Sequence, residues 1–141
     1  IIWAGHRTSA LMDLFLCQKR LMRIITNSSR LSHSAPLFKQ LSILPVYDIN
    51  NLQVGCFMYS AVNRLLPQCF SSMFVTNSTL HSYRTRRHND IHQTQFRLNI
   101  TKFSIRVYGA LLWNSLDSEI KCLPTLSSFK NRYKQNLIAS L

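Results

Sequence analysis

Residues 49–66 are apolar on nearly every face of a helix, and this segment limits the folds open to the chain. A helix with few polar sides is stable only when other elements cover most of its surface. Asp48 is suited to cap this helix, and Leu66-Pro67 is suited to end it. Gly55 costs about 1 kcal/mol against alanine in mid-helix, so its presence predicts the close approach of a neighbouring helix. We therefore predict a domain built around this central helix.

Shorter helical patterns flank the central segment in the sequence. A helix capped by Thr8 or Ser9 is predicted to run to Ile25, with an apolar stripe of Leu11, Leu14, Phe15, Leu21, Met22 and Ile25. Ser34-Ala35-Pro36 opens a short helix through Leu41, because proline is tolerated in the first turn. Leu44-Pro45-Val46 is expected to be extended. A last helix from about Thr125 presents Phe129, Tyr133 and Leu137 inward at intervals of four.

Residues 96–116 predict strands followed by a short helix. Phe103, Ile105 and Val107 alternate with polar residues, which is the period of a half-buried strand. Residues 96–100 alternate in the opposite phase, so a turn or a β-bulge is expected near Thr101. Gly109 would form a joint before a buried helical turn in which Trp113 packs on the central helix. The predicted fold class is therefore mainly α (α+β), a helical domain around a central buried helix with a small two-stranded β element.

Basic residues far outnumber acidic ones. Seventeen Lys and Arg face five Asp and Glu, which gives a net charge of +12. Such a field favours polyanions, above all nucleic acid. Tyr83, Phe103 and Tyr108 lie beside basic residues, the pairing that base stacking and phosphate contact use, although each aromatic ring alone is more typical of a core. The candidate phosphate contacts are Lys19, Arg20, Arg23, Arg84, Arg86, Arg87, Lys102 and Arg106.

The residues of familiar catalytic sites are scarce in this sequence. The three glycines are isolated, so no phosphate-binding loop or dinucleotide motif is formed. The five acids include one close pair, Asp117 and Glu119, whose spacing does not put both on one helix face. His88 and His92 could grip a metal if helical, but no third ligand is apparent. No two of the four cysteines are close in sequence, and Cys17 and Cys56 are expected to be buried thiols. We expect no cofactor, no metal and no catalytic residue in this chain.

Several short motifs follow one another along the chain. They are Trp3, Leu14-Phe-Leu-Cys-Gln-Lys-Arg-Leu-Met-Arg-Ile-Ile25, Pro36-Leu37-Phe38-Lys39 with Leu44, Leu52-Gln53 with Phe57-Met58-Tyr59, His81-Ser82-Tyr83-Arg84-Thr85-Arg86, Trp113-Asn114-Ser115-Leu116, Ile120-Lys121 and Ser127-Ser128-Phe129-Lys130. Their order and spacing resemble the C-terminal region of non-LTR retrotransposon reverse transcriptases of the Jockey-like group. The chain departs from that pattern at Ala4, where glycine or proline is common, and at Asp117, where proline is common.

The resemblance implies a region downstream of the polymerase, whose endonuclease and Tyr-x-Asp-Asp motif lie further upstream and are not in this sequence. Residues 1–141 are then a single C-terminal domain of a longer polyprotein, with residues 1–5 the truncated end of an element. The expected function is non-catalytic binding of RNA or DNA through phosphates, beside the upstream polymerase domain, in the nucleus or cytoplasm and without a membrane. The alternatives are a structural cap or assembly module that packs on the polymerase, a relic without activity, and, most remotely, an independent enzyme with a Cys or His nucleophile.

Overall fold

The computed structural model describes residues 11–70, 72–83 and 85–141, and this part of the chain is mainly helical. The longer helices are α1 (Met12–Ile25), α2 (Ser34–Leu41), α3 (Val46–Val62), α6 (Ala110–Ser115) and α8 (Leu126–Ala139). Single helical turns are η2 (Gln68–Phe70), α4 (Asn77–Leu80), α5 (Asn99–Lys102) and α7 (Ser118–Lys121), and η3 (Ile105–Gly109) is a π-helical turn. The predicted helices that end near residues 25, 41, 66, 113 and 137 are all present among the described residues, with shifted ends. The predicted cap at Thr8 or Ser9 lies outside the described residues.

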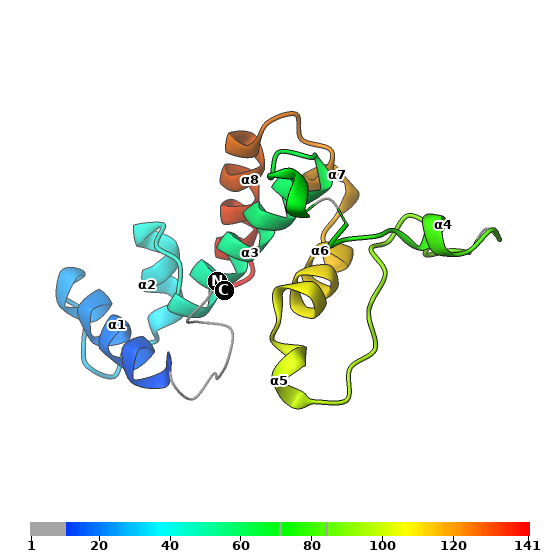
Figure 1. Ribbon diagram of the computed structural model, residues 1–141. Helices are drawn as coiled ribbons and strands as arrows, with labels where there is room; N and C mark the ends of the chain where they lie inside the picture. Colours follow the sequence, from blue (N-terminus) through cyan, green and yellow to red (C-terminus); the bar gives the residue numbers. More distant parts are fainter. Residues whose placement is uncertain (1–10, 71, 84) are drawn as a thin grey trace.

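The central helix α3 packs most extensively against α8, and α6 with η3 packs beside it (Figure 1). The main core contains Met58 and Phe129, both fully buried, together with Trp113 of α6. The ring centroid of Phe129 lies 5.9 Å from that of Trp113 and 4.8 Å from that of Tyr59. As predicted, Trp113 is an interior anchor, and Phe129 and Tyr133 form the buried face of α8.

A second, smaller core joins α1 to α2. Its buried members are Met22, Leu37 and Phe38, and Phe15 packs against them half-buried. This helix pair lies at one end of the molecule, while the segment around α4 lies at the opposite end (Figure 1). The predicted apolar stripe of α1 is only partly correct, because Leu14, Leu21 and Ile25 are exposed.

Three helices end in the same backbone conformation, which was not predicted from the sequence. The helices α1, α2 and α3 are each followed by a left-handed residue other than glycine: Asn27, Ser42 and Arg64. After α3, the amide of Leu65 donates to the carbonyl of Ser60 at 2.8 Å, the bond expected of a Schellman ending. The central helix therefore ends at Val62, before the proline that was predicted to stop it. It also begins at Val46 after extended Pro45, so the predicted capping role of Asp48 is wrong.

The predicted β element is absent from the described residues. Residues 105–115 instead run continuously from the π-helical turn η3 into α6, and Gly109 has ordinary helical angles rather than forming a joint. Val107, Ala110 and Trp113 are buried, so the same segment also satisfies a helical spacing of three. Short apolar runs fit both periods, and packing on α3 decides between them. Thr101 lies in the helical turn α5, which stands where the bulge or turn was expected.

At Gly55, α3 and α8 approach each other closely, as the position of this glycine in the sequence predicted. A Cβ atom at this position would lie 2.5 Å from Cε1 of the buried Tyr133 ring. We predict that Gly55→Ala lowers the free energy of unfolding by about 1–3 kcal/mol, because a packed ring has to move. Urea denaturation measures the change. Gln53→Ala, at an exposed position of the same helix, should stay within about 0.5 kcal/mol of the parent; an equal effect of both would contradict this account.

Candidate nucleic-acid interface

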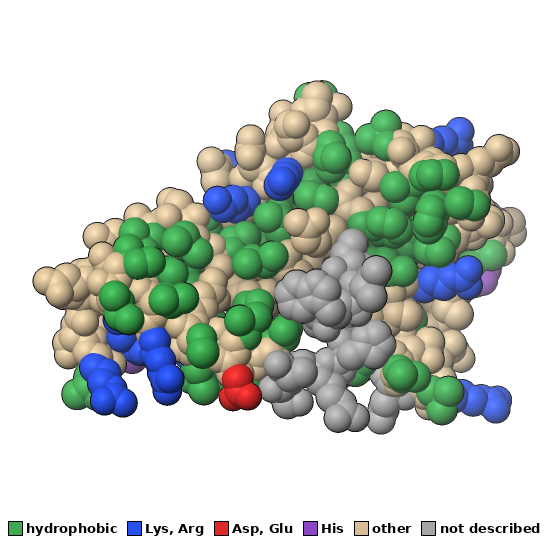
Figure 2. Space-filling view, turned by 60° about the vertical axis from the view of Figure 1, so that its left-hand side comes forward, with side chains coloured by type: hydrophobic (Ala, Val, Ile, Leu, Met, Phe, Trp, Pro, Cys, Tyr) green, Lys and Arg blue, Asp and Glu red, His purple; other side chains and the backbone are tan. Residues whose placement is uncertain are grey.

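The structure separates the predicted phosphate contacts into distinct groups. Lys19, Arg20 and Arg23 lie on α1, Arg86 and Arg87 in the loop after α4, and Lys102 and Arg106 on α5 and η3; Arg84 lies outside the described residues. The α1 group and the loop group are at opposite ends of the molecule (Figure 1). On one face, basic side chains likewise occur in separate places (Figure 2). The structure therefore does not join these residues into one continuous surface.

Two of the α1 side chains have partners within the chain. The Lys19 Nζ atom lies 4.2 Å from the centroid of the Phe15 ring, a cation–π contact. The Arg23 Nε–H donates to the carbonyl of Ser32 at 3.0 Å, which ties the following turn to the helix. Arg20 is exposed. Lys19 and Arg23 therefore make contacts within the chain, and the Arg23 bond stabilises the turn that follows the C-terminal end of α1.

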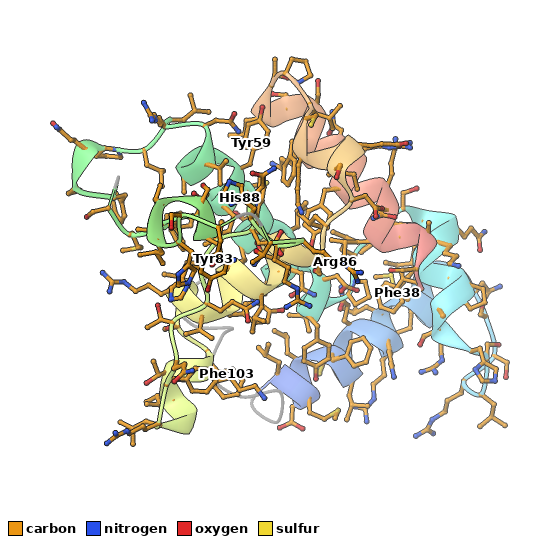
Figure 3. All side chains as sticks on the ribbon, turned by 90° about the vertical axis from the view of Figure 1, so that its right-hand side faces the viewer. Phe38, Tyr59, Tyr83, Arg86, His88 and Phe103 are labelled. Atoms are coloured by element: carbon orange, nitrogen blue, oxygen red, sulfur yellow. The ribbon has the colours of Figure 1, made fainter. Side chains whose placement is uncertain are left out.

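Residues 77–90 form a loop whose stem is closed by backbone bonds. Thr76 and Ile91 make an antiparallel bridge, the amide of His92 donates to the carbonyl of Val75 at 2.7 Å, and that of Asn77 to Asp90 at 2.9 Å. Such a closure brings distant residues side by side without an extended sheet. Arg86 and Arg87 are exposed on this loop. Figure 3 labels Arg86 together with Tyr83 and His88 of the same loop.

Asn114 fixes the loop to the main core. Its Nδ2 donates to the carbonyl of Ile91 at 2.9 Å, and its Oδ1 accepts from the Ile91 amide at 3.0 Å. Ile91 is buried in the main core, and Asn114 belongs to α6, next to the buried Trp113. One amide side chain therefore satisfies both backbone groups of a buried loop residue. Sequence reasoning missed this role, because the two residues are far apart in the chain.

A second amide organises the loop from within. The Nδ2 atom of Asn77 donates to the carbonyl of Arg87 at 2.8 Å, and its Oδ1 lies 3.2 Å from Nδ1 of His92. These bonds set the backbone on which Arg87 is presented. Because hydrogen bonds hold the loop at its stem and in its interior, its basic side chains project from a backbone of defined conformation.

An open cavity of about 360 Å³ lies against this loop. Its lining residues are Asn77, His81, Tyr83, Thr85, Arg87, Asp90, Ile91, His92, Gln93 and Asn114. The rings of His81 and Tyr83 stack with centroids 5.3 Å apart and planes 25° apart, and the Tyr83 side chain is 63% exposed. Tyr83 was considered in the sequence as a stacking residue beside basic groups, whereas His81 was not. Exposed stacked rings and an arginine around one cavity are features that can bind an unpaired base and its phosphate.

The basic side chains are not neutralised by acids of the same chain. Within residues 11–70, 72–83 and 85–141, no Lys or Arg forms an ion pair with Asp or Glu. Asp90 is the acid that lines the cavity, and its neighbour Arg87 is exposed. The positive field therefore stays available to an outside anion, weakened locally by one carboxylate.

Burial raises the pKa values of Cys56, Tyr108 and Asp48, which favours their neutral forms. Burial raises the pKa of the Cys56 thiol, which disfavours a nucleophilic thiolate there. Tyr108 donates to Oδ1 of Asn51 at 2.5 Å, and Nδ2 of Asn51 donates to Asp48 at 3.2 Å. Burial and the nearby Asp48 raise the pKa of Tyr108, and burial raises that of Asp48. This chain of polar groups joins α3 to η3, and we assign it a structural role.

No group of three or more His, Cys, Asp and Glu side chains is arranged for a metal ion in the part of the chain that the structure describes. All four cysteines are free, and Cys17 is exposed, so its predicted burial is wrong; Cys56 is half-buried. None of the described helices has the length and apolar character needed to cross a membrane.

The comparisons with known proteins give no relative. No family model, no curated protein and no solved structure matches this chain. The account of its function therefore depends on the residues and on the geometry described above.

The Asn114 clamp makes a direct prediction about the loop. Asn114→Ala leaves both backbone groups of Ile91 without their partner, which should lower the free energy of unfolding by about 1–3 kcal/mol. Because the stem opens more readily, tryptic cleavage after Arg86 or Arg87 should also be faster than in the parent. Ser115→Ala is the control, since that exposed hydroxyl bonds only to the carbonyl of Leu112 in its own helix. Unchanged cleavage in Asn114→Ala would contradict the clamp.

Stability should fall at alkaline pH through Tyr133. Burial, with smaller contributions from Tyr108, Asp48 and Cys56, raises the pKa of Tyr133 strongly above 10. The unfolded chain then loses this proton above pH 10 while the folded chain keeps it, so the free energy of unfolding decreases as pH rises further. Tyr133→Phe should show a shallower decrease above pH 10 in denaturation series at several pH values. Parallel curves for the two proteins would show that Tyr133 does not titrate in this way.

Proposed function

We propose that this chain is a non-catalytic module that binds RNA or DNA through the basic loop of residues 77–90. One observation supports the proposal above the others: a clamped loop places the exposed His81–Tyr83 stack and Arg87 around the same open cavity. Aromatic rings hold bases by stacking, and arginine holds phosphates. The net charge of +12 supplies long-range attraction for the same class of ligand.

The shape of the site favours unpaired nucleotides. A base in a duplex has no free face to offer the His81–Tyr83 stack, whereas an unpaired base does. Arg86 and Arg87 are both exposed on the same loop and can follow the backbone of a single strand. Lys102 and Arg106 are also exposed and remain candidates for further phosphate contacts. We therefore propose single-stranded segments of RNA or DNA as the preferred ligands.

We further propose that the module belongs to a reverse transcriptase polyprotein of the Jockey-like group, as the sequence motifs suggest. Two of those motifs lie in one structural unit: His81 and Tyr83 line the cavity, and Asn114 of the Trp-Asn-Ser-Leu motif lines it too. A shared role in one site gives a physical reason for both motifs to occur together. The chemistry of polymerisation would then be carried out by the upstream domain.

Loss of the loop cations should weaken binding in a salt-dependent way. We predict that Arg86→Ala with Arg87→Ala reduces the log–log salt slope by about 1.4 on a single strand, since each lost phosphate contact changes it by about 0.7. Fluorescence anisotropy with a labelled oligonucleotide at several salt concentrations measures the slope. The matched control is Lys130→Ala with Arg132→Ala, which removes the same charge from exposed positions of α8.

The aromatic contribution can be separated from the charge in the same assay. Tyr83→Ala should cost about 1–3 kcal/mol of affinity for a single strand and should leave weak duplex binding unchanged. An assembly module that does not touch nucleic acid would show equal affinities for the parent, the loop variants and the α8 control. That outcome would reject the proposal.

A further inference from the structure

The helix α1 exposes a narrow apolar stripe along one flank. Leu14, Cys17, Leu21 and Ile24 follow one another at intervals of three, four and three residues, the spacing of a seam between two packed helices. The exposed fractions of Leu14, Leu21 and Ile24 are 49%, 55% and 73%. A soluble domain seldom leaves such a row uncovered unless another element packs there.

The orientation of this stripe is set by the opposite contacts of α1. Met22 is buried on the inner face, where it packs with Leu37 and Phe38 of α2. Gln18 fixes the helix to the start of α3, because its Nε2 donates to the carbonyl of Leu44 at 2.8 Å and its Oε1 accepts from the amide of Val46 at 3.0 Å. These bonds prevent α1 from rotating into an orientation in which its apolar flank would face the core. Among the described residues, the stripe therefore faces away from the core.

Arginines border the C-terminal end of the stripe. An open cavity of about 550 Å³ is lined there by Arg20, Arg23, Ile24, Asn27, Ser28 and Arg30. Ile24 belongs to both the stripe and the cavity, so apolar and basic surfaces are continuous. Hydrophobic and basic side chains also lie next to one another at the α1–α2 end of the molecule in Figure 2. None of these arginines is paired with a carboxylate of the described chain.

We propose that this surface, the α1 seam (Leu14, Cys17, Leu21, Ile24 and the bordering Arg20, Arg23 and Arg30), binds an acidic amphipathic helix of a partner protein. The spacing fits the apolar face of one helix, which the partner would supply at i, i+3, i+7 and i+10. Glutamate or aspartate beside that face would meet the arginines. The inference is independent of the nucleic-acid proposal, because it uses the opposite end of the molecule.

Charge distinguishes this partner from the other possible occupants. A second copy of the chain would bring arginine next to arginine in a protein of net charge +12. Nucleic acid would satisfy the arginines but leave Leu14, Leu21 and Ile24 uncovered. A membrane surface would favour a wider apolar face than one seam, and Asp13 lies in the first turn of α1. An acidic helix covers both parts of the surface.

The test uses the whole chain and three designed helical peptides. One carries leucine at i, i+3, i+7 and i+10 with glutamate on both flanks; the second has lysine in place of glutamate, and the third alanine in place of leucine. Fluorescence anisotropy should show binding of the first peptide only, weakened as salt rises. Leu21→Gln with Ile24→Gln should reduce its affinity by about tenfold or more, and Arg20→Ala with Arg30→Ala should reduce it severalfold. The control, Val62→Gln, replaces an exposed apolar residue of α3 and should have no effect.

Each other result would overturn the proposal. Equal binding of the acidic and basic peptides would show apolar adhesion without selection, and absence of binding by the acidic peptide would show that the seam does not accept such a helix. A dimer that Leu21→Gln with Ile24→Gln dissociates would identify a second copy as the occupant. Sedimentation with phosphatidylcholine vesicles containing phosphatidylserine, lost in the same variant, would identify a membrane surface. Thermal denaturation checks that the variants keep the parent fold.

Discussion

The close contact of α3 with α8 at Gly55 is the constraint on which the rest of the structure depends. Because a hydrogen is all that this position carries, the ring of Tyr133 can lie against the backbone of the central helix. That approach brings Phe129 against Tyr59 and Trp113, and these rings form the middle of the main core. Through Trp113, α6 also packs against this core. A single small residue therefore sets the distance at which several large side chains become buried.

The same packing positions the basic loop. Once Trp113 is buried, the next residue, Asn114, faces the loop and binds both backbone groups of Ile91. The loop stem is thus attached to the core by one side chain, while Arg86, Arg87 and the His81–Tyr83 stack stay exposed. The hydrogen bonds that hold the loop lie at its stem and in its interior, whereas the side chains that would meet a ligand are exposed. This division is common where a rigid scaffold presents a binding loop.

In the helix pair α1–α2, α1 is buried on one face only. Its small core, around Met22, Leu37 and Phe38, covers only the inner face of α1. The outer flank combines apolar side chains with arginines that have no acidic partner among the described residues. Part of the positive charge thus lies on two separate surfaces of different composition: a basic loop with aromatic rings at one end, and a basic surface with an apolar seam at the other. Different surfaces of this kind are suited to different partners.

The sequence by itself determined the helices whose residues repeat a local pattern, including the inward Phe129–Tyr133 face and the need for a close approach at Gly55. It did not determine the secondary structure of residues 96–107, because short alternating apolar residues fit a strand and a helical turn equally well. Packing of η3 against α3 decides the conformation of residues 105–107. Nor did it show that Leu14 and Leu21 are exposed. An amphipathic pattern identifies the apolar side chains of a helix, but it does not show which of them another element covers. The clamp between Asn114 and Ile91 joins residues remote in sequence. Only the tertiary structure decided these features, because each depends on contacts between distant parts of the chain.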